Sequence, residues 1–217
     1  MDEKIERVLS GALWNEFCDR LKSAGETILR PSTPATVFDR AEGIRYLTRL
    51  LRAGLEPALD PRRGLDHGAW APLHLAYPVA DIPTLQLSIQ SDLPAAHHLR
   101  LGEALRPLRD EGVLILGSGS ATHNLQAFRQ SRLQLDSPTP PWAAAFADWL
   151  AGAVARGDRA ALLDWQAAPQ ALENHPSPEH FLPFFVALGA GTPGLAGRAL
   201  HRSWTYGVLA MDAYAFD

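Results

Sequence analysis

Histidines are the residues of this sequence best suited to chemistry, and all eight lie at or after position 67. A histidine has an unperturbed pKa near 6.5, so it can move protons at neutral pH, and its neutral ring is a common metal ligand. Three lie in settings typical of a site. His67 stands between Asp66, which could orient its ring, and Gly68; His123 follows a glycine-serine loop; His180 precedes an apolar segment that predicts a helix.

The other five histidines give weaker signals. His74, His97 and His98 are interpreted as structural residues that hydrogen-bond within the fold. His175 and His201 are left open between that role and the lining of a pocket. No two histidines have the i, i+4 spacing of a helical zinc motif, so spacing alone defines no metal site.

Composition excludes several classes of protein. The single cysteine, Cys18, allows no internal disulfide and no cysteine-rich zinc site, and its apolar helical surroundings predict a core residue. The net charge is −4 with acids and bases interspersed, so no basic stripe is present to attract nucleic acid. No apolar run approaches the ~20 residues that span a bilayer. The N-terminus lacks the layout of a signal peptide, so we expect a cytoplasmic protein.

The first 57 residues predict a helical hairpin that extends the main domain. Apolar residues recur at helical spacing from Ile5 to Leu21, and Ser32-Thr33-Pro34 interrupts the pattern. A second helix is predicted from Asp39, with Glu42 three residues later as a capping box, to Leu55.

Residues 58–217 predict an α/β domain. Thr84–Ile89 alternates with period two, which predicts a half-buried strand, and Val113–Leu116 predicts a short buried strand. The second strand ends in the glycine-serine loop 117–120, and such strand ends are where α/β sheets bind ligands. Helices are predicted over His97–Arg109, Trp142–Val154 and Phe181–Leu188, and a closing strand or hairpin over Trp204–Phe216.

Six segments in one order carry a resemblance to an enzyme family. They are Gly64–Leu73, Tyr77–Pro83, Gln86–Ser88, Leu105–Val113, Ser118–Leu125 and Pro178–Pro183. Residues 63 to 216 resemble the class III extradiol dioxygenases of the LigB superfamily, in particular their DOPA 4,5-dioxygenase-like branch. The resemblance implies a partial LigB-like central sheet flanked by helices, and an oxidoreductase that opens catechol-type aromatic rings next to the diol.

The resemblance also implies a site. Family members bind ferrous iron, or zinc in its place, through histidines and in some branches a carboxylate, and their substrates are a catechol and dioxygen. By position, His180 matches a metal ligand. His123 matches a histidine that transfers protons or is counted with the metal site, and His67 matches a pocket histidine that contacts substrate or dioxygen. Ser118 is a further candidate for the pocket.

The N-terminal part departs from the family. There, two more metal-binding histidines come from a His-Gly-Ser-Pro loop and a Ser-Ala-His-Trp segment, whereas the first 66 residues here contain no histidine. Residues 1–57 resemble instead the opening of an unrelated, uncharacterised bacterial family. Asp39 and Glu42 could supply carboxylates in place of the lost ligands, although both have the pattern of helix starts. Losing the first strands would expose sheet edges unless the new helices cover them.

Three hypotheses stay open on the sequence. The chain is an active dioxygenase with a site rebuilt around His67, His123 and His180, or a catalytically impaired remnant or binding protein with a partial metal pocket. The third is an assembly module whose helices form a homo-oligomer. A serine hydrolase is disfavoured because Gly117-Ser118-Gly119 does not match the Gly-x-Ser-x-Gly motif.

Overall fold

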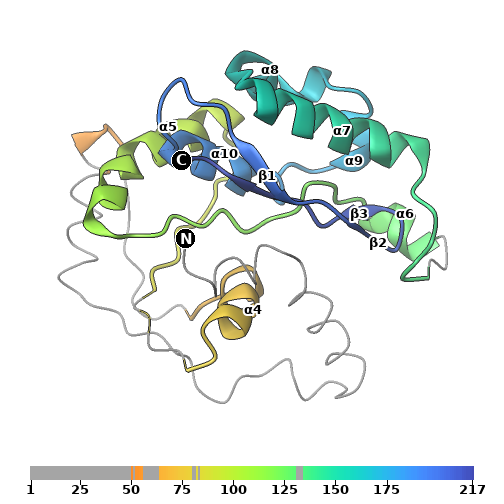
Figure 1. Cartoon of the computed structure of the whole chain (residues 1–217), viewed down its shortest axis with the longest axis horizontal. Helices are drawn as coiled ribbons and strands as arrows, with labels where there is room; N and C mark the ends of the chain where they lie inside the picture. The colour runs from red at the N-terminus through yellow and green to blue at the C-terminus, as the bar shows by residue number, and fades with distance from the viewer. Residues whose placement is uncertain (1–49, 51, 56–63, 80–81, 83, 131–133) are drawn as a thin grey trace. The chain divides into compact units, whose positions relative to one another are not determined.

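The computed structural model describes residues 50, 52–55, 64–79, 82, 84–130 and 134–217 (Figure 1). The chain divides into two compact units, of which the first ends at Ser88 and the second begins at Ile89. The helical hairpin predicted over residues 1–57 lies almost wholly outside the described residues, as do Asp39 and Glu42. That hairpin, its boundary after residue 57 and the two carboxylates stay predictions.

In the first unit, helix α4 (His67–Ala76) begins at an aspartate cap. The Asp66 carboxylate accepts a hydrogen bond from the Ala69 backbone N–H at 3.2 Å and from Gln86 Nε2 at 2.8 Å. Gln86 Oε1 in turn accepts from the Asp66 backbone N–H at 2.8 Å. This exchange fixes the segment around Gln86 to the start of α4. The strand predicted over Thr84–Ile89 is wrong, because this segment has no regular secondary structure.

The second unit contains the predicted helices and several shorter ones that were not predicted. They are α5 (Ala95–Leu105), the 3₁₀ helix η2 (Arg106–Glu111), α6 (Leu125–Gln130), α7 (Pro141–Arg156), α8 (Arg159–Leu163), the 3₁₀ helix η3 (Trp165–Ala167), α9 (Ala171–Asn174) and α10 (Leu182–Ala190). The helices predicted over His97–Arg109, Trp142–Val154 and Phe181–Leu188 are confirmed as α5 with η2, α7 and α10. In the part of the chain that the structure describes, no helix is long and apolar enough to span a membrane.

Prolines and glycines set the ends of these helices. Pro141 and Pro183 lie in the first turns of α7 and α10, where a missing N–H costs no helical hydrogen bond. Gly112 ends η2 with φ 83° and Gly157 ends α7 with φ 64°, left-handed conformations that a side chain would strain.

Within the described residues, the strands lie near the C-terminus and form two small antiparallel sheets. They are β1 (Arg198–His201), β2 (Trp204–Thr205), β3 (Leu209–Ala210) and β4 (Ala213–Ala215). β1 pairs with β4 and β2 pairs with β3. The closing hairpin predicted over Trp204–Phe216 is confirmed, whereas β1 was not predicted.

The strand predicted over Val113–Leu116 is also wrong. The segment has no regular secondary structure and no ladder partner among the described residues. Its side chains nevertheless alternate: Val113 and Ile115 are half-buried, while Leu114 is 54% and Leu116 is 42% exposed. One face of this apolar segment is therefore open to solvent, contrary to the expected burial on both faces.

The core of the second unit lies between α7, α10 and the C-terminal strands (Figure 1). α7 packs against β1 and β3, and its Phe146 and Leu150 are fully buried. α5 packs closely on α10. A Cβ atom added to Gly102 of α5 would lie 2.0 Å from the Val186 carbonyl oxygen, and one added to Gly189 of α10 would lie 2.1 Å from the Leu99 carbonyl oxygen. The two helices can approach this closely only because both positions are glycine.

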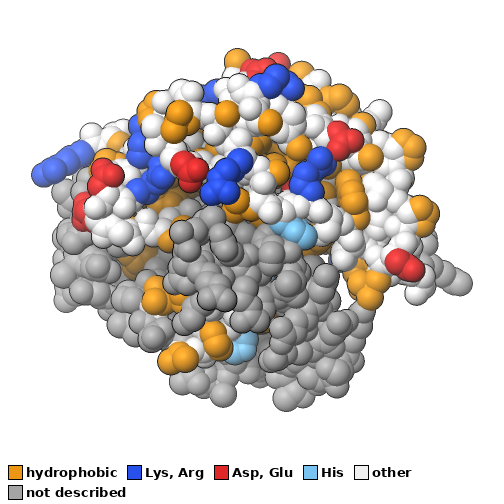
Figure 2. Space-filling view, viewed as in Figure 1, with side chains coloured by type: hydrophobic (Ala, Val, Ile, Leu, Met, Phe, Trp, Pro, Cys, Tyr) orange, Lys and Arg blue, Asp and Glu red, His pale blue; other side chains and the backbone are white. Residues whose placement is uncertain are grey.

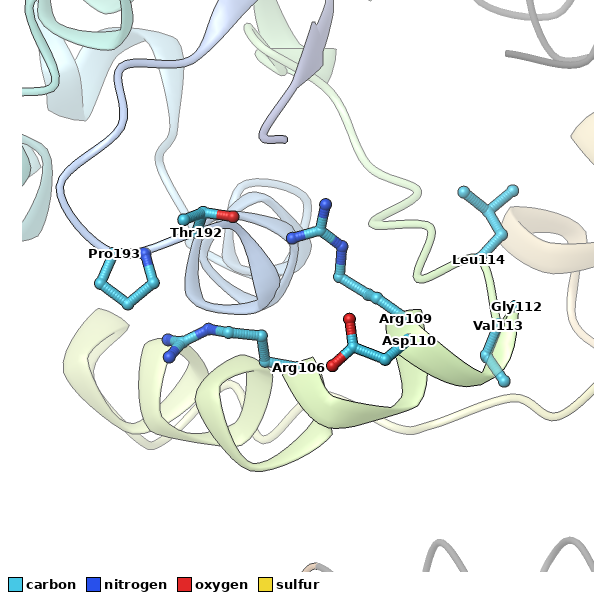
Figure 3. A pocket seen from close by; sticks show the side chains of 8 residues that line it. All are labelled: Arg106, Arg109, Asp110, Gly112, Val113, Leu114, Thr192 and Pro193. Atoms are coloured by element: carbon cyan, nitrogen blue, oxygen red, sulfur yellow. The ribbon is translucent and has the colours of Figure 1, made fainter.

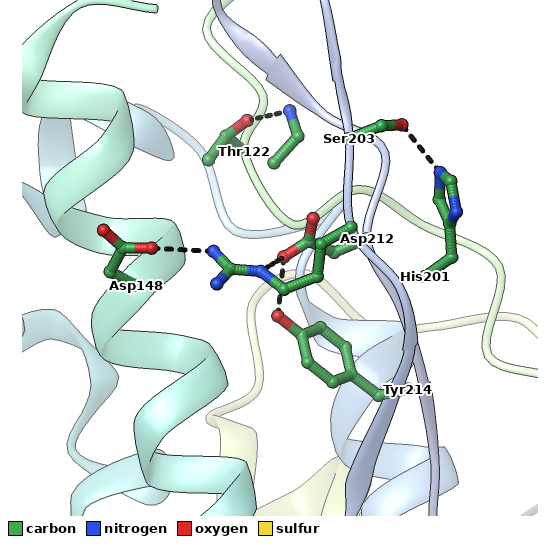
Figure 4. Close-up of polar contacts among 8 residues, drawn as sticks. Thr122, Asp148, His201, Ser203, Asp212 and Tyr214 are labelled. Carbon is green, nitrogen blue, oxygen red and sulfur yellow. Dashed lines mark hydrogen bonds and ion pairs between the residues drawn. The ribbon is translucent and has the colours of Figure 1, made fainter.

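A polar network joins α7 to the C-terminal strands (Figure 4). Arg202 donates from Nη2 to Asp148 of α7 at 2.9 Å and from Nε to Asp212 Oδ2 at 3.1 Å. The Tyr214 hydroxyl donates to the same Asp212 oxygen at 2.7 Å. The Asp212 side chain is only 2% exposed, and burial raises the pKa of this carboxyl even though two donors on it oppose the effect.

The face of the molecule shown in Figure 2 carries charged side chains of both signs in alternation over the described residues. On this face no basic patch forms, in agreement with the mixed charge pattern of the sequence.

Candidate functional site

The structure brings two of the candidate histidines together. The rings of His123 and His180 stack with their centroids 3.6 Å apart and their planes at 24°. His123 comes from the segment that follows the glycine-serine loop, and His180 lies two residues before α10. Both side chains are half-buried, so the pair can be reached from solvent while it is partly shielded from it.

Backbone contacts hold the loop against the segment that carries His180. The Ser120 N–H donates to the His180 carbonyl oxygen at 2.8 Å, and the His123 N–H donates to the Asn174 carbonyl oxygen at 2.9 Å. A Cβ atom on Gly119 would lie 2.2 Å from the His180 carbonyl oxygen. The glycines of the loop therefore permit the close approach that makes the two rings meet.

The electrostatics of the pair favour a neutral His123. Burial lowers the pKa of His123 below its ordinary value of 6.5, and the nearby His180 lowers it further. Glu179 lies 4.0 Å from His180, measured from Oε1 to Nε2. Burial of Glu179 opposes its ionisation, but the hydrogen bond from the Ser177 hydroxyl and the neighbouring histidines leave its pKa below the usual range. A carboxylate thus stands beside a pair of imidazoles.

His175 lies in the aromatic core next to this pair. It is 1% exposed, stacks on Phe181 with centroids 4.8 Å apart, and meets Phe146 and Trp165 edge-on. Its Nε2 is 3.0 Å from the Ala121 carbonyl oxygen, so Nε2 carries the proton. Nδ1 is buried and has no hydrogen-bond partner among the described residues. Burial lowers the pKa of His175 to about 4, which keeps the ring neutral at neutral pH.

Because His175 is buried as a neutral ring, we expect the free energy of unfolding to depend on pH. The unfolded chain binds a proton on this residue below pH 6.5, but the folded chain does so only below about 4. The stabilisation that neutral His175 contributes is therefore fully present above pH 6.5. It is lost as the pH falls toward 4, which lowers the free energy of unfolding by about 3 kcal/mol. We expect the free energy of urea unfolding to decline over that interval.

The variant His175→Gln keeps an N–H that can donate to Ala121 but does not titrate, so its unfolding free energy should fall less over the same interval. His74→Gln, on the exposed face of α4, is the matched control and should follow the wild type. Equal pH dependence in His175→Gln and wild type would contradict the assignment.

Three further candidates have surroundings of their own. His67 is exposed at the first position of α4 in the first unit, and the Asp66 carboxylate, expected to orient it, accepts from Ala69 and Gln86. His201 lies on β1 with Nε2 2.7 Å from the Ser203 hydroxyl (Figure 4). Ser118 is half-buried in the loop.

Two of the three histidines interpreted as structural make the expected hydrogen bonds. His97 bonds Gln90 Oε1 at 2.9 Å. His98 is fully buried, with Nδ1 3.1 Å from the Pro94 carbonyl oxygen and Nε2 accepting from the Gln90 N–H at 3.2 Å. His74 is exposed on α4.

The donors at the pair do not make a complete metal site. Within the described ranges, no three histidine, cysteine, aspartate or glutamate side chains are grouped so that they could hold one metal ion. The pair offers two imidazoles in a stacked arrangement, with the Glu179 carboxylate at 4.0 Å from one of them. A tetrahedral or octahedral ion needs more ligands than two imidazoles provide.

A surface cleft of about 590 Å³ lies at η2 and the end of α10 (Figure 3). Arg106 donates from Nη2 to the Gly189 carbonyl oxygen at 2.8 Å, and Arg109 donates from Nη1 to that of Ala190 at 2.9 Å. These are the last carbonyls of α10, so the arginines cap a helix C-terminus. No histidine lines this cleft, which is therefore distinct from the stacked pair.

Comparison with known proteins identifies the family. Residues 46–216 match the family described as the catalytic LigB subunit of aromatic ring-opening dioxygenase. The chain is 47% identical over 158 residues to the 4,5-DOPA dioxygenase extradiol of Beta vulgaris, covering 72% of this chain and 58% of that protein. It is 38% identical over 208 residues to the protein of the same name from Mirabilis jalapa, covering 93% of this chain and 75% of that one.

A solved structure shares the fold. The crystal structure of an uncharacterized protein from Escherichia coli K12 is 30% identical with a TM-score of 0.73, and the match covers 86% of this chain and 76% of that one. The chain thus spans less than two thirds of the Beta vulgaris relative and about three quarters of the solved structure. Because the family match extends over most of its length, the chain belongs to the LigB family of aromatic ring-opening dioxygenase subunits.

Proposed function

We propose that the chain is an extradiol dioxygenase that opens catechol-type rings, with DOPA or a similar diol as substrate. The stacked pair of His123 and His180 carries the proposal, because it unites two segments that resemble the family. Relatives named 4,5-DOPA dioxygenase extradiol support the reaction class. Dioxygen is the second substrate.

The pair supplies the acid–base part of this chemistry. A catechol must lose a hydroxyl proton before oxygen attacks its ring, and a general base needs a neutral ring at the working pH. His123 is such a base because burial and His180 lower its pKa. The Glu179 carboxylate lies 4.0 Å from His180 Nε2, so the base stands beside a second imidazole and a carboxylate.

Ferrous iron, or zinc in its place, is the cofactor that we infer for the family reaction. His180 is the described residue that would contribute to its binding, with His123 as the alternative ligand if its ring is not the base, and further donors are needed because two imidazoles do not complete a site. His67 stays a candidate for contact with substrate.

The small number of side chains available to bind a metal favours a second function. No histidine precedes His67 in the sequence, and no three-donor group exists within the described ranges. On this alternative the chain is a catalytically impaired remnant or a binding protein with a partial metal pocket. Such a site would bind a divalent ion weakly and exchange it readily.

One experiment separates the two functions. The protein is loaded with ferrous iron without oxygen, separated from free iron, and mixed with DOPA and dioxygen. A dioxygenase consumes one dioxygen per DOPA and produces a new visible absorbance. His123→Ala, loaded identically, is the control for oxidation of DOPA by released iron. Folded protein that retains no iron and gives the same rate as this control would establish the impaired alternative.

A further inference from the structure

Thr122, the residue before His123, is buried and bridges two backbone groups. It is 0% exposed. Its hydroxyl donates to the Val208 carbonyl oxygen at 2.9 Å. It also accepts from the Ala210 N–H at 2.7 Å, the contact drawn from Thr122 in Figure 4. A single hydroxyl therefore satisfies a donor and an acceptor of the chain around β3, more than 80 residues away. No valine or alanine could do this.

His123 is held from the other side as well. Its backbone N–H donates to the Asn174 carbonyl oxygen at 2.9 Å. Asn174 is 0% exposed and donates from Nδ2 to the carbonyl oxygens of Trp142, at 3.1 Å, and Gln170, at 2.9 Å. The backbone of His123 thus lies between an anchor on β3 and an anchor on α9, and its ring projects onto His180.

We propose that Thr122 is a positioning residue for His123, fixing the imidazole over His180 by tying the loop to the C-terminal strands. The inference rests on the proposed function, in which His123 moves the proton of the diol. A side chain that acts through another commonly changes activity by about 10–100-fold when it is removed. Displacement of the loop would change the overlap of the two rings, whose centroids lie 3.6 Å apart.

The test uses three variants of the full chain. Thr122→Val keeps the shape and removes both hydroxyl bonds, whereas Thr122→Ser keeps the hydroxyl. Thr192→Val changes a threonine that is exposed and distant in sequence from both histidines. Two quantities are measured for each: kcat with DOPA, and the NMR cross-peak between ring protons of His123 and His180 in histidine-labelled protein, with urea unfolding to establish that the variant is folded.

We expect Thr122→Val to lower kcat by about 10–100-fold with little change in KM, and to weaken the ring cross-peak. Thr122→Ser should restore both to near the wild-type values, and Thr192→Val should change neither. Folded Thr122→Val with unchanged kcat and cross-peak would overturn the proposal.

The same data keep this inference separate from the proposed function. If the wild type turns over no diol, the proposed function fails, but loss of the cross-peak in Thr122→Val with recovery in Thr122→Ser still establishes the positioning role. If the wild type is active and Thr122→Val only unfolds more easily, with its cross-peak intact, the positioning role is excluded and the dioxygenase stands. If Thr122→Val does not fold, Thr122→Ala and Thr122→Ser are compared in the same way, and an unchanged cross-peak in folded Thr122→Ala overturns the proposal.

Discussion

Replacing His123 by alanine is expected to lower kcat for ring opening by about 10²–10⁴-fold, the range that a positioned acid–base group contributes. The effect should be large because His123 is neutral at neutral pH and its ring touches His180. His180→Ala should cause a similar loss, since it removes the other ring of the pair. Initial rates of product absorbance over a range of DOPA concentrations give kcat and KM for each variant.

The pair predicts that the two losses are not additive. When two residues act as one unit, the first substitution already removes most of the activity that depends on the pair. The kcat of the double variant should therefore be only slightly lower than that of either single variant. His74→Ala on α4, which is exposed, serves as the matched control and should retain the wild-type rate. A His123→Ala protein with the wild-type kcat would remove His123 from the mechanism.

Replacing Gly102 by alanine is expected to destabilise the fold by more than about 3 kcal/mol, beyond the usual cost of overpacking. The added Cβ would lie 2.0 Å from the Val186 carbonyl oxygen and 2.8 Å from the Ala190 N. Both are backbone atoms of α10, so the clash can be removed only if one helix shifts as a whole relative to the other. Urea unfolding monitored by circular dichroism gives the change in free energy.

Gly152→Ala is the matched control, because Gly152 also lies inside a helix, α7. Its added Cβ would meet only the end of the Arg156 side chain, at 3.0 Å, which can move. This variant should be neutral or stabilised by up to about 1 kcal/mol, since alanine restricts the unfolded chain. Equal stability of the two variants would show that α5 and α10 are not packed as described.

The helices could be predicted because their signals are local. Apolar spacing alone located α5, α7 and α10, and Gly112 stopped the predicted helix where a left-handed residue is needed. Even so, the sequence did not reveal why α5 can lie on α10. The closeness of Gly102 to Val186 depends on residues more than 80 positions apart.

The two predictions of strands were wrong because the formation of a strand depends on a partner segment and is not local. A strand exists only when another segment pairs with it, and period-two alternation records which side chains face inward, not whether a partner is present. Val113–Leu116 does alternate between half-buried and exposed side chains, as a strand would, but no segment among the described residues pairs with it. Thr84–Ile89 is extended in pattern but is held to α4 through Gln86 instead.

The sequence predicted individual residues of the site but not the contacts between them. His123 and His180 were named from their settings, but their stacking follows from the Ser120–His180 backbone bond and the close approach of Gly119, which spacing does not encode. Thr122 was missed because its partners lie near β3. The pairing of His67 with either residue stays a prediction, as do the homo-oligomer and the cytoplasmic location.

The polar network around Arg202 has a consequence for how the molecule unfolds. It ties α7 to the C-terminal strands, and Thr122 ties the same strands to the loop of His123. Because hydrogen bonds join these parts, we expect them to unfold as one cooperative unit. The amide protons of the His123 loop should then exchange as slowly as those of the core. We therefore expect the stacking of His123 on His180 to last for as long as the native state itself.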